Sequence, residues 1–502
     1  MKRIFPVPVL LLLLMTLSIL SSCTPSSSPS STASSITLSS FDPFDPPDFT
    51  PPKAPADWIT PGDYKVSHIN VEAVAPQKVP ARSIALPMSQ QSSLLMPTLD
   101  GGCLAVAQIP VDEKDTSGNT FYYLQAIWFK ADGTVKWDQQ YKADTFKGYP
   151  VTMCVFPDGG FAVSLSIRKE NTIDYETTDR LCRFSPDGTM VWQSKEDQVA
   201  TGALDHIFAT QDGAVLAAGT VAAASPAGSG SSGNNEIGLL RFEKDGSISA
   251  NLTFGIVGYN TLTDASYATG TGLVLVWRSD AATAASETAA SGQVSQIGCF
   301  GEDLSKQWVA SMPAGESLFN VQALSGGKGA FAFGNLPSSI SATSASSSQS
   351  TRSTLFHFDS KGIENWTYSM EEANTWMLKA ASLSDGRFIG CGYRTATDGS
   401  QVSTLVILSK NGKFLNTLKP LPGIIEQLIP TKDGGFTVVL RQSVSAIPQP
   451  PYISSIWMDT EVIVAHYDRN TGVVWQRKID QYKHALRIDQ VIVTVDGRLL
   501  IG

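Results

Sequence analysis

A short phrase returns throughout the chain, and it consists of an Asp-Gly pair followed by residues that alternate between apolar and polar. Asp-Gly flanked by alternating apolar residues is a strong β-hairpin signal, because a tight turn needs a positive φ that glycine adopts at little cost. Six copies are clear, and two weaker ones begin near residues 269 and 324. The turn aspartates of the clear copies are Asp100, Asp158, Asp212, Asp385, Asp433 and Asp496. The sequence therefore predicts eight hairpins of this first type.

A second phrase alternates with the first, and in it an apolar strand leads through a turn to a tryptophan. The copy "FSPDGTMVWQ" at 184–193 is the clearest. In four copies the tryptophan falls four residues after the turn residue, whereas Trp475 falls three residues after Gly472, so we expect one additional residue in that last turn. The turn residues of the seven copies are Gly133, Gly188, Gly246, Leu304, Gly362, Gly412 and Gly472.

Together the two phrases specify a repeat of about 55 residues that contains two hairpins. Two hairpins form a four-stranded antiparallel sheet, and seven or eight such sheets in succession are typical of a β-propeller. The fold class is therefore predicted to be all-β, a propeller of four-stranded antiparallel blades. Eight blades are favoured, because the half blade at 485–502 could be completed by a strand from 63–75 and so hide the edges; seven is the alternative.

The beginning of the chain indicates where the protein is placed. Residues 1–22 are predicted to be a signal peptide, since Lys2 and Arg3 precede an apolar run at 7–20 that is too short for a bilayer span. The run ends in Leu20-Ser21-Ser22-Cys23, which resembles a bacterial lipobox. This resemblance implies that Cys23 is acylated and anchors the mature protein to a membrane. The alternative is an ordinary signal peptide with a chance cysteine.

The remaining chain is interpreted as a tether and one domain. Residues 23–60 are rich in Ser and then in Pro, a composition that cannot form a packed core, and 61–502 are predicted to be a single β-propeller domain. The expected location is the cell envelope, on the extracytoplasmic side of a membrane, which is the outer membrane if the cell is Gram-negative.

Composition excludes several classes of partner and site. The formal net charge is −9 and no Lys/Arg cluster occurs, so nucleic acid is not expected as a partner. No zinc-type Cys or His spacing and no nucleophile motif is found, so no catalytic, cofactor or metal site is predicted. Five scattered cysteines are predicted to be buried free thiols rather than a disulfide framework: Cys103, Cys154, Cys182, Cys299 and Cys391.

One copy of the second phrase, "AHYDRNTGVVW" at 465–475, is similar to the repeat of PQQ-like β-propellers. The resemblance covers roughly residues 80–502 as a style of repeat, and it implies the propeller fold. Quinoprotein dehydrogenases of that family commonly carry a pair of adjacent cysteines over the quinone, and this chain has no such pair, so no quinone cofactor is expected. Lipid-anchored members of the family include a scaffold lipoprotein of the outer-membrane barrel assembly machine.

Seven Ser/Ala/Thr-rich segments separate a first-type hairpin from a second-type hairpin, and their equal topological position predicts that they share one face of the ring. The segment at 443–455 and the residues after it are the best candidate for a contact loop, through Tyr452 and Trp457. We therefore expect a non-enzymatic binding or scaffold protein with a protein or glycan partner on the loop face. The alternative is a periplasmic enzyme, quinone-dependent or glycan-active, with its site at the central channel.

Overall fold

The chain divides into two units, Met1–Thr50 and Pro51–Gly502, and all residues that the structure describes belong to the second. The structure is a computed structural model. It describes residues 94–501 except 115–119, 133, 142–147, 169–176, 196–197, 223–234, 256–257, 282–292, 314, 338–350, 371–374, 396–400, 422, 432–433, 447–457, 480–490 and 494–498.

The described fold contains seven four-stranded antiparallel sheets, which we number as blades 1 to 7 in chain order, and one two-stranded sheet. Blade 1 contains β1 (Leu94–Pro97), β2 (Cys103–Lys114), β3 (Thr120–Phe129) and β4 (Val135–Tyr141). Blade 2 contains β5 (Tyr149–Val155), β6 (Phe161–Arg168), β7 (Thr177–Phe184) and β8 (Met190–Gln193). Blade 3 contains β9 (His206–Ala209), β10 (Val215–Ala222), β11 (Asn235–Phe242) and β12 (Ile248–Phe254). Blade 4 contains β13 (Gly258–Ala268), β14 (Gly272–Ala281), β15 (Gln293–Phe300) and β16 (Lys306–Ser311).

The remaining strands complete the series. Blade 5 contains β17 (Ser317–Ala323), β18 (Ala330–Pro337), β19 (Thr351–Phe358) and β20 (Glu364–Ser369). Blade 6 contains β21 (Thr375–Ser382), β22 (Phe388–Thr395), β23 (Gln401–Leu408) and β24 (Phe414–Thr417). Blade 7 contains β25 (Ile424–Pro430), β26 (Phe436–Ala446), β27 (Met458–Tyr467) and β28 (Val473–Ile479), and a two-stranded sheet of β29 (Val491–Val493) and β30 (Leu499–Ile501) follows.

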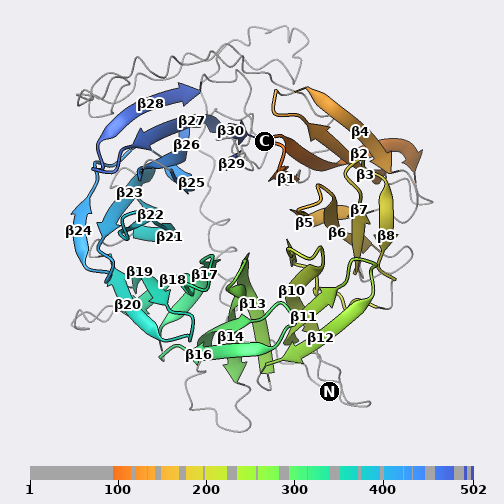
Figure 1. Cartoon of the computed structure of the whole chain (residues 1–502), viewed down its shortest axis with the longest axis horizontal. Helices are drawn as coiled ribbons and strands as arrows, with labels where there is room; N and C mark the ends of the chain where they lie inside the picture. The colour runs from red at the N-terminus through yellow and green to blue at the C-terminus, as the bar shows by residue number, and fades with distance from the viewer. Residues whose placement is uncertain are drawn as a thin grey trace, which may run out of the picture. The chain divides into compact units, whose positions relative to one another are not determined.

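The blades follow one another around a ring, with the first strand of each innermost and the fourth outermost (Figure 1). The predicted β-propeller is therefore confirmed. The four-stranded blades described number seven, which is the alternative count; the predicted half blade near the C-terminus is the β29–β30 sheet, and β29 contacts both β25 and β1. The strand expected at 63–75 lies outside the described residues. In the described part of the chain, no helix has the length and hydropathy of a membrane span.

Both phrases form the turns that the sequence predicts. In the first type, the Gly159 N–H donates to Phe156 O at 2.9 Å, and Gly159 has a φ of +84°. In the second type, the Gly188 N–H donates to Ser185 O at 2.9 Å, and Gly188 also has a φ of +84°. Leu304 stands where other copies have glycine and takes a φ of +62°.

The last copy of the second phrase corrects one expectation, because its turn carries no additional residue. The Asp468 N–H donates to Gly472 O, and the Thr471 N–H donates to Asp468 O, which is the same spacing as in the turn that begins at Ser185. Thr471 occupies the glycine position with a φ of +67°. Trp475 therefore falls four residues after the turn residue, as the other tryptophans do.

Replacing Thr471 by glycine is expected to stabilise the protein by about 1 kcal/mol, because a β-branched residue is strained at positive φ and glycine is not. Asn470→Gly in the same turn is the matched control, since Asn470 has no positive φ and its replacement only adds freedom to the unfolded chain. Urea denaturation midpoints of the two variants check this. A Thr471→Gly midpoint at or below that of the parent would contradict it.

The core lies between neighbouring blades, and β6, which follows the Asp158-Gly159 pair, alternates as the first phrase predicts. Phe161, Val163 and Leu165 pack with Trp128 and other residues of blade 1. Ala162, on the opposite face, packs in a cluster shared with blade 3. Such alternation is required of a strand covered on both faces.

In the blades that carry them, the recurring tryptophans join the outer strand to the next blade; β12 and β24 have no tryptophan. The Trp137 indole N–H donates to Pro186 O and the Trp192 indole N–H donates to Lys244 O, each at 2.9 Å. At Gly362, a Cβ atom would lie 2.5 Å from Cδ2 of Trp308. Glycine is therefore required in this turn both by its positive φ and by the close approach of the indole. We call the contact between the tryptophan and the turn glycine of the next blade the tryptophan–turn contact.

Arginines make a second connection between blades. The Arg183 guanidinium in β7 donates to Gly213 O in the β9–β10 turn, lies 3.1 Å from the Asp158 carboxylate and stacks over the Phe156 ring. Its side chain is 3% exposed, so the first-type aspartate partners a buried charge. The five cysteines after Cys23 are all buried and free, as predicted.

Candidate functional site

The innermost strands share a β-bulge at the same register. In blades 2, 4, 5, 6 and 7 one extra residue interrupts the pairing of the first strand with the second. Bulges redirect the side chains that follow them and are frequent near functional sites. The extra residues are Val151, Thr263, Phe319, Leu378 and Glu426.

The residue after the bulge is polar in each of these blades, and His206 of blade 3 occupies the equivalent register opposite Ala218. All of these side chains are half-buried. We call this set the polar ring, and its members are Thr152, His206, Asp264, Asn320, Lys379 and Gln427. Leu94 holds the same register in blade 1.

Three members of the polar ring act on one another. The Asp264 carboxylate accepts the Val321 N–H of blade 5 at 2.8 Å, and the charges of His206 and Lys379 both act on it. Lys379 belongs to blade 6 and Asp264 to blade 4, with blade 5 between them. Two side chains on non-adjacent blades interact in this way only near the axis, so Asp264 and Lys379 lie near the centre of the propeller. The other members hold the same register on their own innermost strands.

Burial sets the protonation of the ring. It lowers the pKa of His206, against the opposing effect of the Asp264 charge, and it raises the pKa of Asp264. His206 is therefore a neutral imidazole at neutral pH, and so offers one donor and one acceptor. Ionised Asp264 opposes folding at pH values above its raised pKa.

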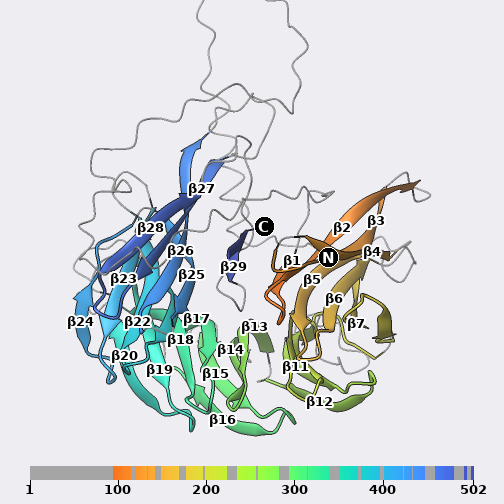
Figure 2. The same ribbon diagram turned by 45° about the horizontal axis from the view of Figure 1, so that its top comes forward.

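Aromatic side chains lie at one end of the same strands. Tyr149, Tyr259 and Trp376 are 45%, 52% and 40% exposed at the beginnings of β5, β13 and β21. Phe319 in β17 packs edge-on against Trp376, with ring centroids 6.5 Å apart. These beginnings lie at the end of the ring where second strands lead to third strands, toward which β2, β3, β26 and β27 extend (Figure 2). We call this the loop end.

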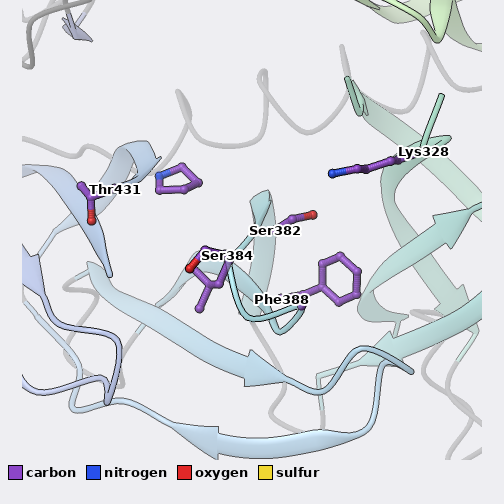
Figure 3. A pocket seen from close by; sticks show the side chains of 8 residues that line it. Lys328, Ser382, Ser384, Phe388 and Thr431 are labelled. Atoms are coloured by element: carbon purple, nitrogen blue, oxygen red, sulfur yellow. The ribbon is translucent and has the colours of Figure 1, made fainter. Parts of the chain in front are cut away.

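A hollow of about 480 Å³ lies at the opposite end of the ring, beside the first-type turns of blades 5, 6 and 7. It is lined by Lys328 of blade 5, by Ser382, Ser384 and Phe388 of blade 6, and by Thr431 of blade 7, among others (Figure 3). One ammonium and several hydroxyls face it, without a carboxylate among the lining residues, so it lacks an acid/base pair.

The residues singled out from the sequence have mixed outcomes. Cys23, Tyr452 and Trp457 lie outside the described residues, as do most of the Ser/Ala/Thr-rich segments. His357 and His466 occupy equivalent places and stack on Trp366 and Trp475, with centroids 5.1 and 5.7 Å apart. In the described ranges, no group of three His, Cys, Asp or Glu side chains could hold a metal ion.

Sequence reasoning missed the polar ring, although a signal for it exists. Each ring residue stands six positions before the turn residue of its first-type hairpin: His206 before Asp212, and Lys379 before Asp385. The bulge shifts the alternation at this point, so the period of two gives no indication of which way these side chains face.

No family model matches the chain, and the search of curated proteins found no match. Solved structures with a similar fold include the Dos1 propeller (10% identity, 68% of this chain and 84% of that one, TM-score 0.40). The β-propeller domain of the Trilobed protease from Pyrococcus furiosus is another (9% identity, 78% and 99%, TM-score 0.38). Prolyl oligopeptidase B from Galerina marginata is a third (11% identity, 82% and 54%, TM-score 0.40), and the chain spans about half of its length. These likenesses carry no argument about function.

Proposed function

We propose that the protein is a lipid-anchored, extracytoplasmic β-propeller of the bacterial cell envelope that binds a protein or glycan partner at its loop end without catalysis. The observation that carries the proposal is the group of exposed aromatic side chains at that end, Tyr149, Tyr259 and Trp376. Exposed aromatic residues cost solubility, and tryptophan and tyrosine are the usual anchors of binding surfaces.

The place of these residues also supports binding. They lie where the inner strands begin, at the end of the ring where the second strands end and the third strands begin. Loops gathered on one face of a rigid scaffold commonly form its contact surface. The PQQ-like repeat and the lipobox at Cys23 add an anchored scaffold as the architecture that we propose, with residues 23–60 as the tether.

Replacing Trp376 by alanine in the full-length lipoprotein is expected to reduce recovery of the partner at least tenfold. The measurement is cross-linking in intact cells followed by affinity purification. Phe414→Ala is the matched control, because Phe414 is 46% exposed but lies on β24, the outermost strand of the same blade; it should leave recovery unchanged. Equal recovery with parent and Trp376→Ala chains would refute the proposed surface. Cys23→Ala should release the protein from membranes, and retention would refute the anchor.

An enzyme with its site at the polar ring is the second candidate, favoured by the approach of His206 to Asp264. Glycoside hydrolysis ordinarily needs two carboxyl groups about the scissile bond. Asp264 is the one carboxylate among the six members of the polar ring. Binding therefore accounts for the geometry better than hydrolysis does.

A further inference from the structure

We propose that the polar ring is a binding site for the end of a neutral glycan chain, which enters from the loop end past Trp376 and Tyr149. This inference rests on the proposed binding function and names the chemistry of its partner. It commits to a carbohydrate rather than a peptide, for the three reasons that follow.

The first reason is the balance of charge and of hydrogen-bonding groups. The ring combines one carboxylate, one ammonium, one neutral imidazole, two amides and a hydroxyl. The carboxylate and the ammonium offset each other, so the ring has no excess charge with which to select an anionic or cationic ligand. Amides, imidazole and hydroxyl both donate and accept hydrogen bonds, which matches sugar hydroxyls, because each of these also does both.

The second reason is the spacing of the aromatic and polar groups along shared strands. Trp376 stands three residues before Lys379 in β21, and Tyr149 stands three residues before Thr152 in β5. The bulge falls between the two residues of each pair, so their partners on the second strand are two positions apart, which is roughly 7 Å along the strand. A short saccharide could therefore place one ring against an exposed aromatic face while its terminal hydroxyls reach the polar ring.

The third reason is that Asp264 is a carboxylate where an amide would serve the fold. Its carboxylate accepts backbone hydrogen bonds from the Val321 N–H and from Ala265, and an asparagine oxygen could accept them equally well. Groups held at a cost to stability are common at functional sites. Burial raises the pKa of Asp264, so the ionised side chain opposes folding, and this cost declines as the pH falls through the raised pKa and is absent below the ordinary pKa of aspartate.

The test uses the full-length lipoprotein in detergent micelles, with cellohexaose and chitohexaose as probes and calorimetry and tryptophan fluorescence as readouts. At least one hexasaccharide is expected to bind the parent chain. Asp264→Asn is expected to weaken that binding at least tenfold while its melting temperature at pH 7 is unchanged or higher. Asp245→Asn is the matched control, because Asp245 is a surface turn residue of β11–β12 bonded to Ser247; it should bind as the parent does.

Each other outcome overturns the inference. If neither hexasaccharide binds the parent chain, the glycan assignment is wrong; if Asp264→Asn binds as the parent does, the polar ring is not the site. Capture of a protein partner that is lost in Trp376→Ala, without any saccharide binding, would leave the proposed function standing and the glycan inference refuted. Loss of saccharide binding together with a fall in melting temperature would show that Asp264 acts through the fold.

Discussion

Alanine at Gly362 is expected to destabilise the protein by about 2–4 kcal/mol, because it combines a strained backbone with overpacking. Gly362 has a φ of +77°, and its added Cβ would lie 2.5 Å from Trp308 of the preceding blade. The indole is 9% exposed and packed in a core cluster, so it cannot move aside freely. Either the turn or the indole must shift, and both belong to the tryptophan–turn contact.

Gly386 provides a control that separates the cost of backbone strain from the cost of overpacking. Gly386 has a φ of +84°, and nothing lies within 4 Å of the Cβ that alanine would add there. Gly386→Ala should therefore cost only the backbone strain, about 1 kcal/mol. Denaturant midpoints of the two variants measure the difference. Equal losses would show that the tryptophan–turn contact contributes nothing beyond the glycine conformation.

Replacing Arg183 by methionine is expected to cost about 3 kcal/mol, because it removes a buried, fully partnered cation that joins two blades. The guanidinium stacks over Phe156 with 3.9 Å between its central carbon and the ring centroid, and it also bonds Gly213 O and Asp158. Because methionine preserves most of the side-chain volume, the loss of stability would come from the missing polar contacts and not from a cavity. Asp158 is half exposed and can be rehydrated, which keeps the cost from being larger.

Arg387 is the more exposed counterpart of Arg183, and it connects blade 6 to blade 7. It pairs with Asp385 at 2.8 Å and bonds Arg469 O of the next blade, yet its side chain is 25% exposed. Exposed ion pairs contribute little, so Arg387→Met should cost less than about 1 kcal/mol. Thermal melts of both variants check this ranking, and a reversed order would mean that burial does not determine the strength of these connections.

The hairpins could be predicted because their determinants are local. An Asp-Gly pair and the alternation after it contain all the information that a turn and its two strands require, and the blades follow from repetition. The expectation of an additional residue in the last turn is wrong because glycine usually marks the left-handed position, whereas here Thr471 holds that position at a φ of +67°. A sequence pattern indicates which residue usually adopts a backbone conformation. It cannot show where a residue that is strained in that conformation adopts it.

The polar ring could not be predicted, because it depends on where the bulge falls and on which blades meet at the axis. In β21 the bulge at Leu378 reverses the expected alternation, so Lys379 faces the way that the pattern assigns to its neighbour. The proximity of Lys379 to Asp264 joins residues 115 positions apart in the sequence. Only the closure of the propeller brings them together.

The two-stranded sheet of β29 and β30 lies between blade 7 and blade 1, and it forms the smallest connection between neighbouring sheets in the described ring. In the part of the chain that the structure describes, a packed core and tryptophan or arginine contacts hold each other pair of neighbouring blades together, whereas at this seam β29 and β30 are three residues each. In an array held together by neighbours, opening begins where an interface is smallest and then spreads. We therefore expect the ring to open first at this seam. Blades 7 and 1, which lie on its two sides, should then unfold before the other blades.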